Sequence, residues 1–191
     1  MSTPYSGAPS SQAPPTPIYV GLDLSLTSTG VAIIHDGHAT VQRITSKPVK
    51  DATTADQADR LRGIVTRILL AIPDTAYTKV AVEGPSFGST GTAAHILGGL
   101  WWLVRVALEN ADLDTIIASP GTVKRYATGN GNAPKDHVLA AVVRRYPDVN
   151  VTGNDEADAL VLAAIAARHD GHPFEDSLPL AQIAAAAAVT R

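Results

Sequence analysis

The sequence predicts one α/β domain that is built on a mixed five-stranded sheet with helices on both faces. Three short apolar runs follow one another near the beginning of the chain, and later apolar runs alternate with helical patterns. Strands that follow one another through tight turns pair antiparallel, whereas strands separated by a helix pair in parallel. We therefore expect three antiparallel strands and then two parallel strands in the same sheet.

The first three strands are recognisable from their residues. Residues 18–25 (IYVGLDLS) form an apolar run with an acid, Asp23, near its end. The segments GVAIIHD and HATVQRIT flank Asp36-Gly37, a strong signal for a β-hairpin. Residues 1–17 before them contain five prolines and no charged side chain. We expect these 17 residues to be a disordered tail.

Helical spacing and capping residues place the remaining elements in the order helix, strand, helix, strand and three helices. We expect them at residues 54–72, 79–84, 92–110, 115–119, from 120 onward, 134–147 and 154–169. The Ser119-Pro120 pair supplies a cap and a first-turn proline. The folded domain then spans residues 18–170. Residues 171–191 follow as a C-terminal tail whose Ala-rich stretch is compatible with a short helix.

Composition limits the classes of protein that the chain can represent. Its 191 residues include no cysteine, which excludes disulfides and cysteine–zinc sites. No signal peptide begins the chain and no apolar run reaches about 18 residues. We therefore expect a soluble cytoplasmic protein without a membrane contact. The net charge of −3 is unusual for a nucleic-acid binder. Two divalent ions held by acidic residues would more than offset that charge.

Four acidic residues carry the chemistry. Asp23 and Glu83 each end a buried strand, where an ionised acid is costly without a partner. Asp155 and Asp158 are three residues apart at the start of a helix, hence on one face, while Glu156 faces elsewhere. Four converging carboxylates repel one another unless cations lie between them. The set therefore indicates a site for two Mg²⁺ ions, for which Mn²⁺ could substitute, of the kind that hydrolyses phosphodiesters.

Each acid also has a simpler interpretation when it is taken alone. Asp23 could cap a turn, Glu83 could end a strand at the surface, and Asp155 could interact with the helix dipole. Asp158 is followed by an apolar run and is the hardest to explain in this way. The metal site is indicated by the four acids as a set.

Four segments of the chain carry a family resemblance. They are VGLDLSLTSTGVAI (20–33), VAVEG (80–84), VKRYATGNGNAPKDHV (123–138) and NDEADALVLA (154–163). In this order they resemble the RuvC family of Holliday-junction resolvases, whose nuclease domain has the ribonuclease-H-like fold. The resemblance implies a nuclease domain over residues 18–170, in a bacterial or a bacteriophage member. It further implies a Mg²⁺-dependent crossover-junction endodeoxyribonuclease that resolves branched DNA by paired nicks.

By this resemblance, functional roles fall on individual residues. Asp23, Glu83, Asp155 and Asp158 match the metal ligands and catalytic acids of the family. Lys124 and Lys135 match the two lysines of the family near the scissile phosphate, and Lys135 is expected to be catalytic. The expected DNA contacts are Lys124, Lys135, Arg125 and Phe87. The family often has a junction-inserting aromatic residue three positions after the glutamate. Here that place is Ser86, and Phe87 follows it.

The same resemblance implies an assembly, and the residues themselves indicate other surface features. Paired nicks need two active sites, so we expect a symmetric homodimer. Helix 92–110 lies where the family builds part of its dimer interface, and we expect Leu100 and Leu103 to contribute to it. Trp101-Trp102 belong to the core or the interface. Arg144-Arg145 are candidates for phosphate contacts. The residues do not indicate whether the protein has a branch-migration partner.

Three other functions share parts of this pattern. The opening strands are similar to those of ATP-binding modules of the actin and sugar-kinase type, which normally need a longer chain and a second lobe. An RNA-processing nuclease of the same fold would use the same acids. A catalytically inert binder of branched DNA would not need all four acidic residues.

Overall fold

The structure is a computed structural model that describes residues 15–85 and 91–190. Most of the predicted N-terminal tail, residues 1–17, lies outside the described residues, and so does Phe87. The predictions made for both therefore stay predictions.

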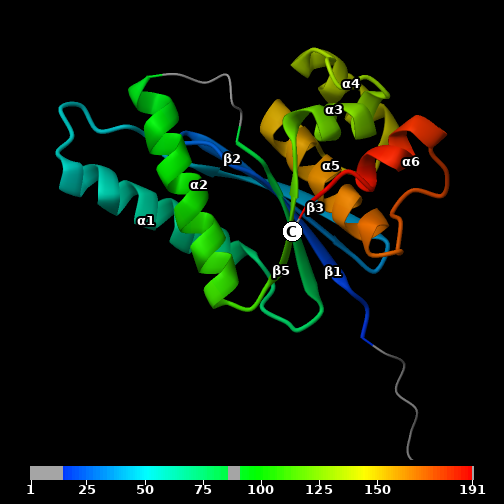
Figure 1. The fold of residues 1–191 in the computed structure, drawn as a ribbon, viewed down its shortest axis with the longest axis horizontal. Helices are drawn as coiled ribbons and strands as arrows, with labels where there is room; N and C mark the ends of the chain where they lie inside the picture. Colours follow the sequence, from blue (N-terminus) through cyan, green and yellow to red (C-terminus); the bar gives the residue numbers. More distant parts are fainter. Residues whose placement is uncertain (1–14, 86–90, 191) are drawn as a thin grey trace, which may run out of the picture.

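The described elements follow the predicted order, and the Ala-rich stretch near the C-terminus forms a short helix (Figure 1). The strands are β1 (Ile18–Asp23), β2 (Ser28–His35), β3 (His38–Thr45), β4 (Thr78–Glu83) and β5 (Asp114–Ala118). The helices are α1 (Thr54–Ala71), α2 (Thr92–Asn110), α3 (Pro120–Thr128), α4 (Lys135–Arg145), α5 (Asn154–His169) and α6 (Leu180–Ala186).

The five strands form one mixed sheet in the order β3-β2-β1-β4-β5. β1, β2 and β3 pair antiparallel, whereas β4 pairs in parallel with both β1 and β5. This confirms the predicted topology. The hairpin between β2 and β3 turns at Asp36 and Gly37, whose φ angles of 49° and 73° are both left-handed. Such a turn matches the twist of the strands, which is why Asp-Gly favours it.

Helices cover both faces of the sheet, and each face has its own core (Figure 1). On one face, α1 and α2 pack their buried residues, such as Ile68 and Val104, against Val20 and Val80 of the central strands. On the other face, α5 lies across β1 and β2, and α3, α4 and α6 surround it. Because α5 lies between the sheet and these helices, eleven of its sixteen residues are buried.

The outer face of α2 carries exposed apolar side chains, but not all those predicted. Leu100 is fully buried, at 0% exposure, in the core beneath α2 together with Val104 and Leu108. The prediction that Leu100 contributes to a dimer interface is therefore wrong, because its position in the helix points it at the sheet. Trp102, Leu103 and Val106 are the large exposed apolar residues of α2.

The segment after α5 packs on the rest of the domain. α6 lies against α3, and the backbone of Thr190 pairs with Ile117 of β5. Ala185 and Ala186 of α6 are each 3% exposed. The division between a domain at 18–170 and a tail at 171–191 stays a prediction. Within residues 15–85 and 91–190, none of the helices combines the length and hydropathy that a membrane span requires.

Candidate metal centre

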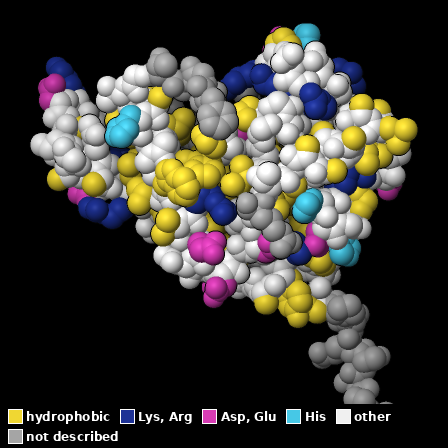
Figure 2. Space-filling view, viewed as in Figure 1, with side chains coloured by type: hydrophobic (Ala, Val, Ile, Leu, Met, Phe, Trp, Pro, Cys, Tyr) yellow, Lys and Arg dark blue, Asp and Glu magenta, His cyan; other side chains and the backbone are white. Residues whose placement is uncertain are grey.

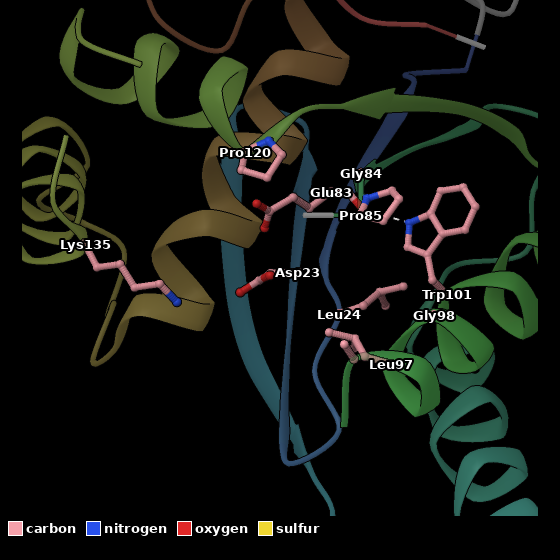
Figure 3. A pocket seen from close by; sticks show the side chains of 11 residues that line it. Asp23, Leu24, Glu83, Gly84, Pro85, Leu97, Gly98, Trp101, Pro120 and Lys135 are labelled. Carbon is pink, nitrogen blue, oxygen red and sulfur yellow. Dashed lines mark hydrogen bonds between the residues drawn. The ribbon is translucent and has the colours of Figure 1, made fainter. Parts of the chain in front are cut away.

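Asp23 and Glu83 end neighbouring parallel strands. β1 and β4 pair in register from Ile18 with Thr78 to Leu22 with Val82, so the next residue on each strand is the acid. Parallel strands in register bring equivalent ends to the same edge of the sheet. The two side chains therefore emerge side by side, as Figure 3 shows.

Asp158 of α5 completes a cluster of three carboxylates. One oxygen from each of Asp23, Glu83 and Asp158 lies within 4.8 Å of the other two. Carboxylate oxygens at such separations can share a divalent cation, because hard cations prefer oxygen ligands. Asp155, one turn earlier on α5, does not join this group among the described residues. Its charge nevertheless acts on both Asp23 and Asp158. Its role as a metal ligand stays a prediction.

Two glycines bring α5 close enough to the sheet to deliver Asp158. A Cβ atom at Gly30 would lie 1.9 Å from the carbonyl oxygen of Asp155, and one at Gly21 would lie 1.9 Å from that of Ala159. Both distances are far inside van der Waals contact, so any side chain would push α5 away. Gly30 is also paired with Asp23 across β1 and β2. The helix and the strand that carry the acids therefore meet at a backbone contact that only glycine permits.

Burial and mutual repulsion hold protons on the carboxylates. Removal from water, followed by the charge of Glu83, raises the pKa of Asp23 to about 9. Burial and then the charge of Glu83 raise the pKa of Asp158 to about 6. Burial also raises the pKa of Glu83, against the opposing effects of its hydrogen bond with Asp23 and of two lysines. Without a cation, the cluster therefore keeps protons that ordinary surface acids lose.

Lys124 and Lys135 are the two lysines whose charges reach this cluster. Both lower the pKa of Glu83 and of Asp158 through space. Lys135 begins α4 and lines the same cavity as Asp23 and Glu83, toward which its side chain extends (Figure 3). The local sequence explains these positions. Ser119 caps α3 by accepting from the backbone of Thr122, and Pro134 is the N-cap residue of α4.

The cavity beside the acids has an apolar wall. Its volume is about 290 Å³, and the wall is formed by residues of α2 and of the loops after β1 and β4, including Leu24, Leu97 and Trp101. The indole Nε1 of Trp101 donates a hydrogen bond of 2.9 Å to the carbonyl oxygen of Glu83 (Figure 3). Trp101 therefore fixes the end of β4.

The comparisons with known proteins identify the family. The family described as Crossover junction endodeoxyribonuclease RuvC matches residues 19–168. This match covers most of the chain and includes all four predicted acids and both lysines.

The chain belongs to the RuvC family.

Individual RuvC relatives match over nearly their whole length. The crossover junction endodeoxyribonuclease RuvC of Sphingopyxis alaskensis is 31% identical over 156 residues, which cover 80% of this chain and 97% of the relative. The enzyme of the same name from Salinibacter ruber is 28% identical over 161 residues, which cover 84% of this chain and 90% of the relative.

Among solved structures, the Thermus thermophilus RuvC structure superposes with a TM-score of 0.59 at 23% identity, over 81% of this chain and 97% of the other. This likeness confirms the ribonuclease-H-like fold. The ATP-binding interpretation of the opening strands is not supported.

Several residues support the carboxylate cluster without having been assigned a role in it from sequence. Glu156 is buried, pairs with Arg43 of β3 at 3.1 Å, and accepts from the backbone of Thr152. It thereby anchors the start of α5 on the side away from the cluster, as its position on the helix predicted. A glycine inside a strand often marks a close backbone approach. This signal could have identified Gly21 and Gly30. No sequence signal pairs Trp101 with Glu83.

The remaining predicted DNA contacts lie on α3 and α4. Arg125 is exposed on α3, one residue after Lys124. The guanidinium of Arg145 is used within the protein, where it donates to the carbonyl oxygens of Tyr126 and Ala127 at the end of α3. Arg144 is exposed on α4 and remains a candidate phosphate contact.

Proposed function

We propose that this RuvC-family protein is a structure-selective endodeoxyribonuclease that resolves Holliday junctions or related branched DNA by phosphodiester hydrolysis with paired nicks. One observation supports this function above all. Three carboxylates from β1, β4 and α5 converge within 4.8 Å, with two lysine charges directed at them. An all-oxygen donor set beside fixed positive charge suits a metal-dependent reaction at a phosphate.

The donor set fits magnesium. Asp23, Glu83 and Asp158 would hold the ions, and Asp155 would complete the set. When bound, a pair of Mg²⁺ ions supplies the Lewis acidity that phosphodiester hydrolysis requires. The carboxylates then ionise, because the cations replace the protons that burial and repulsion otherwise keep on them. Trp101 and Gly30 keep the acids in place by fixing the end of β4 and the approach of α5.

Lys135 and Lys124 provide fixed positive charge that acts on Glu83 and Asp158. In the proposed mechanism, the ammonium group of Lys135 faces the scissile phosphate and opposes the charge that builds on its oxygens. Lys124 holds the neighbouring backbone phosphate, and Arg125 extends this surface. Lys and Arg side chains gather around α3 and α4 in Figure 2. A chain with a net charge of −3 can thus present a basic surface locally.

The substrate is tested by comparing branched and unbranched DNA. With Mg²⁺ we expect paired nicks in a synthetic four-way junction and much slower cleavage of three-way, flap and linear duplex DNA of the same sequence. Mn²⁺ should replace Mg²⁺, whereas Ca²⁺ should support binding with little turnover. Full activity in excess EDTA would contradict the metal mechanism. Equal cleavage of linear duplex would contradict the selectivity for branched DNA, and preferred cleavage of RNA would favour an RNA-processing relative.

The pKa values of the acids predict how the metal-free protein responds to pH. The folded state keeps protons on Asp23 up to about pH 9 and on Asp158 up to about pH 6, whereas an unfolded chain releases them near pH 4. The folded state therefore binds more protons than the unfolded state in this window, and stability falls as pH rises. We expect the metal-free protein to melt roughly 5 °C lower at pH 8 than at pH 5.5.

Two controls accompany this measurement by calorimetry. Saturating Mg²⁺ should raise the melting temperature more at pH 8 than at pH 5.5, because it replaces the missing protons. Asp23→Asn should reduce the difference between the two pH values. A metal-free melting temperature that rises from pH 5.5 to pH 8 would show that the cluster does not hold these protons.

We also propose that the protein acts as a symmetric homodimer through the outer face of α2. Trp102 and Val106 are 66% and 55% exposed, and Leu103 lies beside them. Figure 2 shows hydrophobic side chains gathered over α2 on this face. An apolar patch of this kind marks an interaction surface, and a two-fold axis through it would give two active sites for paired nicks. We expect this assembly to act in the cytoplasm.

A charge placed in this patch should separate the subunits. Val106→Asp should convert the dimer to a monomer in light scattering at micromolar concentration, because a carboxylate buried in an apolar interface lacks a partner. Val143→Asp on α4, where the native side chain is also exposed, serves as the matched control and should remain dimeric. A wild-type protein that is monomeric with and without junction DNA would contradict the proposed assembly.

A further inference from the structure

Glu175 is a buried acid that lies outside the metal centre. It follows α5 in the segment leading to α6, and only 9% of its surface is exposed. A buried carboxylate is costly unless donors satisfy it. The hydroxyl of Tyr126 donates to its Oε2 over 2.8 Å, the hydroxyl of Tyr146 donates to its Oε1, and Nη2 of Arg168 lies 3.0 Å from Oε2. Both carboxylate oxygens are therefore occupied.

The three donors come from three different helices. Tyr126 belongs to α3, Tyr146 caps the end of α4, and Arg168 lies in the last turn of α5. Arg168 also donates from Nε to the hydroxyl of Tyr126 over 2.9 Å. Burial and the adjacent Glu175 carboxylate raise the pKa of both tyrosines, so that both stay donors. Glu175 thus joins α3, α4 and α5 at one point.

The same three helices carry the charged groups of the proposed active site. Lys124 is on α3, Lys135 begins α4, and Asp158 is near the start of α5. α3 and α4 have only 9 and 11 residues, and the turn between them is short. Short helices joined in this way depend on tertiary contacts for their relative placement. The contacts at Glu175 therefore affect where the lysines stand relative to the acids.

A second set of contacts from the same C-terminal segment reinforces the first. Arg145 of α4 donates from Nη2 to the carbonyl oxygen of Ala127 over 2.7 Å and to Oε1 of Gln182 over 2.6 Å. Gln182 belongs to α6 and is buried. The end of α3, the end of α4 and α6 are therefore linked independently of Glu175.

We propose that Glu175 is a positioning residue that holds the two lysine-bearing helices at a fixed distance from the carboxylates of the metal centre. This role rests on the proposed nuclease function. The family match ends at residue 168, so Glu175 and α6 lie beyond it. In this proposal the C-terminal segment of this chain stabilises the positions of α3 and α4. It affects the reaction through these helices without contacting the substrate.

The experiment compares Glu175→Ala with Glu175→Gln in the full-length protein. We measure the single-turnover nicking rate of a four-way junction at saturating enzyme with Mg²⁺, and the junction Kd in Ca²⁺. Glu175→Ala should lower the rate by about 10- to 100-fold, because a displacement of about 1 Å at reacting groups costs up to ~10²-fold. The Kd should change by less than about 3-fold, since the phosphate-contacting groups remain present. Glu175→Gln keeps one acceptor oxygen, and its amide N–H can donate to a tyrosine hydroxyl, which is also able to accept. It should therefore restore the rate to within about 5-fold of wild type.

Hydrogen exchange supplies a readout that does not depend on activity. Glu175→Ala should speed amide exchange in α3 and at the start of α4, while β1 and β4 keep wild-type protection. Ile68→Ala is the matched control, because Ile68 is fully buried in the core on the opposite face of the sheet. It should lower the melting temperature without a selective effect on α3 or on the rate. Tyr126→Phe and Tyr146→Phe each remove one hydroxyl that donates to Glu175. These two variants are tested instead if Glu175→Ala does not fold.

The outcomes separate the two proposals. Unchanged exchange in α3 and α4, or a rate loss in Glu175→Ala no larger than in Ile68→Ala, overturns the positioning role. The same holds if the tyrosine variants, used in its place, keep wild-type rate and exchange. If wild-type protein nicks no branched DNA, the proposed function fails, and the exchange experiment still decides whether Glu175 fixes α3 and α4.

Discussion

Asp23→Asn is expected to reduce the nicking rate of a four-way junction by more than about 10³-fold while junction binding persists. Loss of a single electrostatic group in an active site typically costs ~10²–10³-fold, and loss of a carboxylate that would hold the metal ions should cost more. Asp23 lies at the centre of this argument because Glu83, Asp158 and Asp155 all act on its pKa. The fold should survive, since an amide at this position relieves the repulsion that the carboxylate experiences without a cation.

The measurement is a single-turnover assay with Mg²⁺, combined with fluorescence anisotropy of the junction in Ca²⁺. Asp36→Asn is the matched control, because it makes the same chemical change at the exposed turn between β2 and β3, where asparagine tolerates the left-handed backbone. The control should cleave at the wild-type rate. Nicking at the wild-type rate by Asp23→Asn, after removal of contaminating nuclease, would contradict the assignment of the metal site.

Gly30→Ala is expected to lower the nicking rate by about 10²-fold although it adds a single methyl group. The added Cβ would lie 1.9 Å from the carbonyl oxygen of Asp155 and 3.1 Å from the Cβ of Ala159. Backbone cannot yield as a flexible side chain does, so the start of α5 must move away from β2. Asp158 moves with it, and a shift of about 1 Å at a reacting centre costs up to ~10²-fold. Overpacking should also destabilise the fold by about 1–3 kcal/mol.

Gly63→Ala is the control for this substitution. A Cβ at Gly63 meets nothing within 4 Å, and the residue lies inside α1. Alanine there should stabilise the helix by about 0.5–1 kcal/mol and leave cleavage unchanged. The readouts are the single-turnover rate and the Mg²⁺-induced rise in melting temperature, both of which should fall in Gly30→Ala. If Gly30→Ala keeps the full Mg²⁺ response and rate, the contact between β2 and α5 does not position the acids.

The order of the elements and the identity of the acids follow from local patterns. Asp36-Gly37 specifies a turn by its backbone preference, and Ser119-Pro120 specifies a helix start by its cap. Asp23 and Glu83 stand out because an acid at the end of an apolar strand needs a partner. Each of these signals is contained within a few consecutive residues, so the sequence alone conveys it.

Other features depend on residues that are distant in the chain. Leu100 and Leu103 are the same type of residue and lie on one helix. Only the packing of α2 on the sheet decides that Leu100 is buried and Leu103 is exposed. The hydrogen bond from Trp101 to Glu83 likewise arises where α2 crosses the end of β4. Apolar periodicity predicts that such a helix has a buried face. When the apolar face is wide, periodicity does not determine which of its residues are exposed to solvent.

The sequence by itself determined the sheet, its topology and four acids suited to a metal site. The tertiary structure decided that Asp23, Glu83 and Asp158 converge, because this depends on the approach of α5 to the backbone of Gly21 and Gly30. It also placed Glu175 where it contacts Tyr126, Tyr146 and Arg168 from α3, α4 and α5. Strand and helix patterns arise from interactions between neighbours along the chain. The distance between side chains of different elements is set by packing across the whole domain. No single segment of the sequence contains the information that determines this packing.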